Sequence, residues 1–138
     1  MTHFNFAGFE VVVNATFKES VFNMWGDNMT HNKFVVTIRT DAGMARFFFY
    51  DSFANYQQGK TEPNAEDLKG MLDCYLSDAS CYDCSRDFAD FCNEIGYTSM
   101  DDYHRAKKAF EGCKRHYEGA KRLFGENWYD VANAINEQ

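Results

Sequence analysis

Five cysteines come closest to a recognisable chemical pattern, because Cys81 and Cys84 form a C-x-x-C pair. Together with Cys74 and Cys92, they could supply the four thiolates of a tetrahedral zinc site. Cys74 falls on an apolar helical stripe, however, and Cys92 stands beside Phe91, so both positions are typical of small core residues. A single C-x-x-C pair is weak evidence for zinc. The sequence therefore predicts no bound metal and no other cofactor, with a zinc site on these four cysteines as the alternative.

The histidines and the hydroxyl side chains form no catalytic pattern. His104 and His116 are twelve residues apart on one expected helix, about 18 Å along its axis, which is too far for a shared metal ion. The chain contains neither the H-E-x-x-H pattern of zinc proteases nor the G-x-S-x-G pattern of serine hydrolases. Since no nucleophile, base and stabilising group can be assigned together, we expect a protein that is not an enzyme.

Carboxylates recur at a regular helical spacing. Four of them, between residues 83 and 94, are separated by four, three and four residues, which predicts one acidic ridge on a short second helix. Like charges about 6 Å apart repel, so cations of the same chain or of a partner must compensate them. If a partner does, the ridge and the side chains just after it are the predicted partner-binding residues: Asp83, Asp87, Asp90, Glu94, Tyr97, Asp101 and Asp102.

The cations lie in a later segment, where seven lysines and arginines stand against two glutamates between residues 104 and 122. This helix could compensate the acidic ridge internally. Alternatively, cations at this density can follow a phosphate backbone, although the net charge of −7 argues against direct nucleic-acid binding. The residues predicted to carry that alternative function are Arg105, Lys108, Arg115 and Arg122.

The elements that must position these side chains begin with a β part, residues 1–55. Alternating apolar and β-branched residues predict three antiparallel strands over 9–17, 32–40 and 44–50, with residues 20–31 as a long connection. In the first strand the residues expected on one face are Phe9, Val11, Val13, Ala15 and Phe17. A sheet with one apolar face needs a covering layer.

Residues 56–138 predict about four helices that provide this layer. Ser85 is the expected cap of the second helix, and Gly96 is its expected end. The third helix is expected to begin near Ser99 and Asp102, and its apolar seam ends at Gly125. The expected fold is α+β in a single domain, 1–138, with the N-terminal three-stranded sheet packed against a C-terminal bundle of about four helices. The seam recurs every three or four residues, at Tyr103, Ala106, Phe110, Cys113, Tyr117, Ala120 and Phe124.

Composition sets the broad class. The chain has 138 residues, of which 45% are hydrophobic and 17% aromatic, which is typical of one globular domain. No apolar run is long enough to span a membrane, and five cysteines without an export signal favour reduced thiols in the cytoplasm. Phe48 and Tyr50 are candidates for the interface of a homodimer.

Residues 88–97, F-A-D-F-C-N-E-I-G-Y, resemble an F-x-D-F-C-x-E-x-G-Y block of small proteins encoded by phages and prophages. The resemblance extends from about Tyr56 to Leu123-Phe124-Gly125 and departs after Tyr97, where T-S-M-D-D replaces a D-T-D-S-like cap. It implies an accessory protein that counters host defence. Together with the acidic ridge, it leads us to expect an anti-CRISPR-like inhibitor in the host-cell cytoplasm. We expect its acidic surface to mimic DNA and occlude a basic nucleic-acid or partner site, for example on a CRISPR effector complex.

Overall fold

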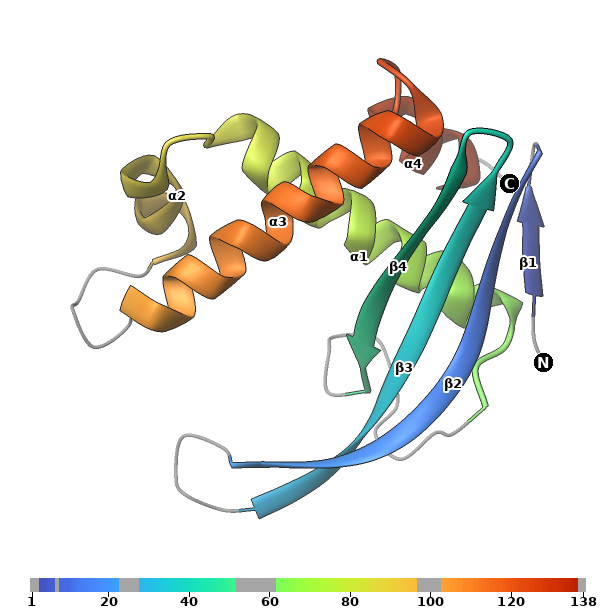
Figure 1. Cartoon of the computed structure of the whole chain (residues 1–138), viewed down its shortest axis with the longest axis horizontal. Coiled ribbons are helices and arrows are strands. Elements are labelled where there is room, and N and C mark those ends of the chain that lie inside the picture. The colour runs from blue at the N-terminus through green and yellow to red at the C-terminus, as the bar shows by residue number, and fades with distance from the viewer. Residues whose placement is uncertain (1–2, 7, 23–27, 52–61, 97–102, 137–138) are drawn as a thin grey trace. The chain divides into compact units, whose positions relative to one another are not determined.

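A computed structural model shows which of these elements form, and it describes residues 3–6, 8–22, 28–51, 62–96 and 103–136 (Figure 1). The fold is α+β, as predicted, with an N-terminal antiparallel sheet of four strands and four C-terminal helices. The chain divides into two compact units, residues 1–72 and 73–138. The boundary falls within the first helix.

The sheet belongs to the first unit and contains one strand more than the sequence predicted. Its strands β1 (His3–Phe6), β2 (Phe9–Phe22), β3 (Asn28–Thr40) and β4 (Gly43–Tyr50) pair in chain order. The additional strand, β1, has only four residues, which is too short for alternation to reveal it. The predicted connection over residues 20–31 was also wrong, because β2 and β3 extend into it and pair as far as Phe22 and Asn28 (Figure 1).

A β-bulge in β2 reverses the predicted orientation of its second half. Val13 pairs with Val36 and Ala15 pairs with Val35, so Asn14 is the extra residue between them. Each side chain after the bulge therefore points to the opposite face from the one that strict alternation predicts. Phe17 is accordingly 56% exposed, and its placement on the buried face was wrong.

The core of the first unit is the other face of this sheet. Phe34, Val36 and Ile38 of β3 are fully buried, and the residues paired with the first two, Phe49 and Phe47 of β4, are nearly so. The first two turns of α1 (Ala65–Cys84) belong to the same unit and contribute three more fully buried side chains. Burying each such side chain stabilises the fold by about 1.5–3 kcal/mol. These three are Leu68, Met71 and Leu72.

Helix α1 begins at a reciprocal cap. The backbone N–H of Asp67 donates to the side chain of Asn64 at 2.9 Å, and the N–H of Asn64 donates to the Asp67 carboxylate at 2.8 Å. The helix then runs for 20 residues to Cys84, across the boundary between the units. No helix in the described ranges is long and apolar enough to cross a membrane.

The second unit also holds α2 (Phe88–Ile95), α3 (Tyr103–Phe124) and α4 (Tyr129–Asn136). Asp87 caps α2, so the prediction of Ser85 as its cap was wrong. Gly96 and Gly125 follow α2 and α3 with φ of 83° and 82°, the left-handed conformation that glycine adopts without strain, and both helix ends are as predicted.

The predicted seam of α3 is confirmed over most of its length. Ala106, Tyr117 and Ala120 are buried, whereas Tyr103 at the beginning of the helix is 43% exposed. The ring of Phe110 packs edge-on against Phe91 of α2, with 5.3 Å between ring centroids. Aromatic rings thus form much of the contact between α2 and α3.

Candidate partner-binding surfaces

The four carboxylates predicted to form one ridge belong to three different structural positions. Asp83 lies in the last turn of α1, Asp87 is the N-cap residue of α2, and Asp90 and Glu94 lie on α2 itself. The prediction of a single ridge on the second helix was therefore wrong. The chain leaves the helical conformation between Cys84 and Phe88, and the four-three-four spacing happens to continue across that break.

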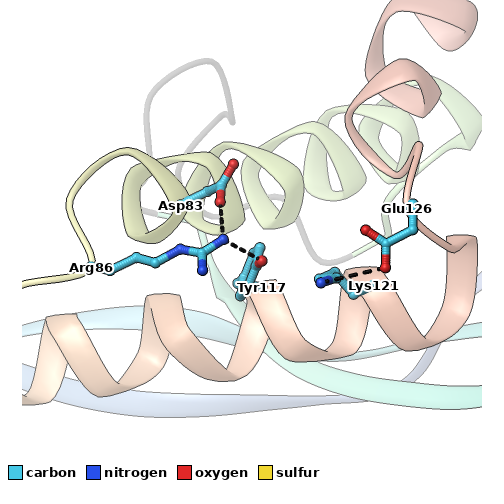
Figure 2. Close-up of polar contacts among 5 residues, drawn as sticks. All are labelled: Asp83, Arg86, Tyr117, Lys121 and Glu126. Carbon is cyan, nitrogen blue, oxygen red and sulfur yellow. Dashed lines mark hydrogen bonds and ion pairs between the residues drawn. The ribbon is translucent and has the colours of Figure 1, made fainter.

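Asp83 is compensated by a close neighbour. The guanidinium of Arg86 donates from Nη2 to Oδ1 of Asp83 at 2.6 Å and also to the hydroxyl of Tyr117 at 2.6 Å (Figure 2). The hydrogen bond to Asp83, followed by the field of Tyr117, raises the pKa of Arg86 above its usual value. This exposed pair joins the end of α1 to α3 through a tyrosine whose ring is buried.

Asp87 has a structural use of its own. Its carboxylate accepts hydrogen bonds from the backbone N–H groups of Ala89 and Asp90, at 3.1 and 3.3 Å. These are orphan donors of the first helical turn, where the helix dipole also favours a negative charge. Asp87 therefore stabilises the beginning of α2 whether or not a partner binds it.

Asp90 and Glu94 are exposed, and neither has an ion pair among the residues that the structure describes. They are four residues apart, so they lie one turn apart on the same side of α2. Phe91, 1% exposed, anchors α2 in the core of the unit and lies next to the side of the helix that carries Glu94. The two carboxylates are thus held on a rigid element and directed to solvent.

The cations of α3 are exposed too. Lys121 forms an ion pair with Glu126 at 3.5 Å, and hydrogen bonding to Tyr117 is the main cause that raises the pKa of Lys121 (Figure 2). Arg122 is exposed, and its field partly offsets the burial that raises the pKa of Tyr75 to about 12. Five others have no ion pair in the part of the chain that the structure describes: Arg105, Lys107, Lys108, Lys114 and Arg115.

Opposite charges on α2 and α3 therefore do not neutralise one another through direct contact. Within the described ranges, no ion pair connects a carboxylate of α2 with a cation of α3. The two helices meet through Phe88, Phe91 and Phe110 instead. Internal compensation of the acidic residues by the basic helix, the alternative left open above, is not observed for Asp90 and Glu94.

Comparison with known proteins adds no relative. No protein-family model, curated protein or solved structure matches the chain. The resemblance of residues 88–97 to phage-encoded proteins stays a prediction.

Two histidine–aspartate pairs could not be found from the sequence. In the second unit, Nδ1 of His116 lies 3.0 Å from Oδ2 of Asp78, and the imidazole stacks on Tyr75 with 4.4 Å between centroids. In the first unit, Nδ1 of His31 lies 3.1 Å from Oδ1 of Asp51, and Asp51 is only 1% exposed. Each pair joins residues 20 or more positions apart, so no local pattern announces it.

The cysteines form no disulfide, and the described residues contain no group of three or more cysteine, histidine or acidic side chains able to hold a metal ion. Cys81 and Cys84 are exposed near the end of α1, and Cys74 and Cys92 are half-buried. Burial, followed by the fields of Asp78, Cys84 and Glu94, raises the pKa of Cys81. The remaining predicted contacts, Tyr97, Asp101 and Asp102, lie outside the described residues.

Proposed function

We propose that the protein is a non-enzymatic binding protein that uses the exposed carboxylates of α2 to contact a basic site on a partner protein. The observation that carries this proposal is that Asp90 and Glu94 are exposed on α2 and have no ion pair among the described residues. Asp83 and Asp87 flank them and add to the negative field, although one is paired and the other caps the helix.

The physical argument is electrostatic. Two carboxylates one turn apart repel each other by a few tenths of a kcal/mol, and a cationic partner relieves this repulsion. A negative surface also speeds diffusional encounter with a basic surface, and this gain decreases as salt rises. Since a groove that binds nucleic acid is basic, a rigid acidic surface is suited to occupy it.

The resemblance of residues 88–97 to phage-encoded accessory proteins selects the partner to test first. It favours a host defence machine, such as a CRISPR effector complex in the bacterial cytoplasm. The inhibitor would act by occlusion, so the effector would lose DNA binding without any chemical change to either molecule.

The test is inhibition of DNA binding by a panel of purified CRISPR effector complexes. The variant Asp90→Lys/Glu94→Lys should weaken inhibition by about tenfold or more, because it replaces both unpaired anions with cations. The control, Glu111→Lys/Glu118→Lys, changes the net charge equally but on α3. If both variants lost inhibition equally, net charge alone would explain the loss. If Asp90→Lys/Glu94→Lys inhibited as well as wild type, the carboxylates of α2 would not be the binding surface. A panel without an inhibited effector would contradict the choice of partner.

One observation favours a second function, direct nucleic-acid binding by α3. Lys108 and Arg115 are exposed, seven residues apart, and have no ion pair in the described ranges. They lie on one side of the helix, two turns apart, where phosphates of a duplex could contact both. Titration of duplex DNA at several salt concentrations decides between the functions, since each phosphate contact contributes about −0.9 to the slope of log K against log salt.

A further inference from the structure

The face of the sheet opposite the core carries exposed aromatic rings next to cations. We call the side chains of Phe17, Lys33, Arg46, Phe48 and Tyr50 the ring face. Lys33 pairs with Phe17 of β2 on one side and with Tyr50 of β4 on the other, so these three form one row across the sheet. Phe48 and Arg46 follow along β4 on the same side, because side chains alternate along a strand.

Two rings of this face, Phe17 and Phe48, are exposed to solvent. Phe17 is 56% exposed and Phe48 is 55% exposed, which is unusual for side chains of this size on a regular sheet. Two strand spacings and an offset of two residues along the strands separate Phe17 from Phe48, so their Cα atoms lie about 12 Å apart. Strand pairing fixes the Cα positions of both residues, so only side-chain freedom is lost when a flat ligand stacks on the rings.

The charges of this face are mainly positive. Nζ of Lys33 lies 4.2 Å from the centroid of the Phe48 ring and 5.7 Å from that of Tyr50. Arg46 is exposed and has no ion pair in the described part of the chain. An oxygen of Glu19 lies 4.0 Å from the Lys33 ammonium and compensates part of that charge.

We infer that the ring face binds single-stranded nucleic acid, with bases stacked on Phe17 and Phe48 and phosphates bound by Lys33 and Arg46. A single strand complements this face, because its flat bases can stack on the rings and its regularly spaced phosphates can bind the cations. A second copy of this chain fits less well, because it would bring another Lys33 and Arg46 against the first pair. The inference concerns the first unit and does not depend on the function proposed for α2.

Fluorescence anisotropy with labelled oligothymidylate and oligouridylate of about twelve nucleotides tests the inference directly. The protein should bind at least one of them more tightly than a duplex of the same length, and the preferred one identifies DNA or RNA as the ligand. Phe17→Ala and Phe48→Ala should each weaken binding roughly 5- to 100-fold, the usual effect of losing one stacked base. Tyr129→Ala is the matched control, because this tyrosine is 54% exposed but lies on α4.

Further variants separate stacking from other causes. Phe48→Tyr should retain binding, whereas Phe48→Leu should lose it, since leucine keeps an apolar surface but has no ring. Lys108→Glu/Arg115→Glu should leave single-strand binding unchanged if α3 is not the site. The inference would be overturned by no binding of either oligonucleotide at low salt, by wild-type affinity in Phe48→Leu, or by loss of binding only in the α3 variant. A concentration-dependent dimer abolished by Phe48→Ala would identify a second copy as the occupant and would also overturn it.

Discussion

The carboxylates around α2 and the cations of α3 differ in how many of them form ion pairs or helix caps within the second unit. Asp83 pairs with Arg86, three residues later, and Asp87 caps α2. By contrast, Lys108 and Arg115 have no ion pair within the described ranges. Caps and pairs three residues apart require only the local geometry of one helix end. Asp83 and Asp87 therefore have local partners, whereas Asp90 and Glu94 of α2 have no ion pair in the described ranges either.

The contact between α2 and α3 explains why these opposite charges do not meet. Phe88 and Phe91 of α2 both pack edge-on against Phe110 of α3. An interface made of rings excludes water, and moving an ion pair into it would cost several kcal/mol for each ion. The charged residues are thus kept on the outer sides of the two helices. A unit built this way displays its acidic and basic surfaces separately.

The largest change in stability is expected when the ring that anchors α2 is removed. Phe91→Ala should reduce the free energy of unfolding by about 3–5 kcal/mol, because this residue is 1% exposed and its loss leaves a cavity. Denaturant unfolding followed by circular dichroism measures the change. The control, Asn93→Ala, alters an exposed residue of the same helix and should stay within about 0.5 kcal/mol of wild type. Similar stability of both variants would contradict the view that rings fix the acidic surface.

The same variant also sharpens the functional comparison. If α2 detaches when Phe91 is lost, binding through Asp90 and Glu94 should weaken, whereas duplex binding by α3 should persist in any folded fraction. Binding is measured at a temperature where most of the variant is folded.

The periodic elements could be predicted from the sequence, and the interruptions could not. The seam of α3 was predicted because Ala106, Tyr117 and Ala120 recur with the helical period, and a long helix has enough repeats to make this unambiguous. The prediction of one acidic ridge was wrong for a related reason. Its spacing continues through the break between α1 and α2, and periodicity cannot detect a change of helix axis.

Two other features depend on interactions that the sequence does not display. The bulge at Asn14 is defined by pairing with β3, so alternation alone placed Phe17 on the wrong face. The Asp78–His116 pair joins residues 38 positions apart on α1 and α3. Such contacts follow from the packing of elements, which a single sequence does not determine.

Loss of the N-cap of α2 is expected to reduce stability by an intermediate amount. Asp87→Ala should lower the free energy of unfolding by about 0.5–2 kcal/mol, since two backbone N–H groups lose their acceptor. Asp90→Ala is the matched control, because its carboxylate is exposed and has no ion pair in the described part of the chain. Thermal unfolding of both variants measures the difference. If Asp87 served only a partner, the two substitutions would have the same small effect.

The smallest effect at neutral pH concerns the thiol of Cys113 on α3. Burial, followed by the fields of Asp78 and Cys81, raises the pKa of Cys113 from 9.0 to about 12. Because the thiolate is the nucleophile, alkylation at pH 8 should be more than about 100-fold slower at this cysteine in the folded protein than in the denatured one. Mass spectrometry of the alkylated peptides measures each rate.

The raised pKa of Cys113 also predicts how stability depends on pH. Above pH 9 the unfolded chain loses the thiol proton, whereas the folded chain keeps it until about pH 12. The folded state then binds more protons, so the free energy of unfolding decreases as pH rises through this window. Tyr75, with a pKa of about 12, contributes in the same direction above its ordinary value of 10.0.

Cys113→Ala should make the decrease between pH 9 and 12 less steep, whereas Cys84→Ala, which alters an exposed thiol, should retain the wild-type slope. Equal slopes in the two variants would show that burial does not raise the pKa of Cys113 in the folded protein.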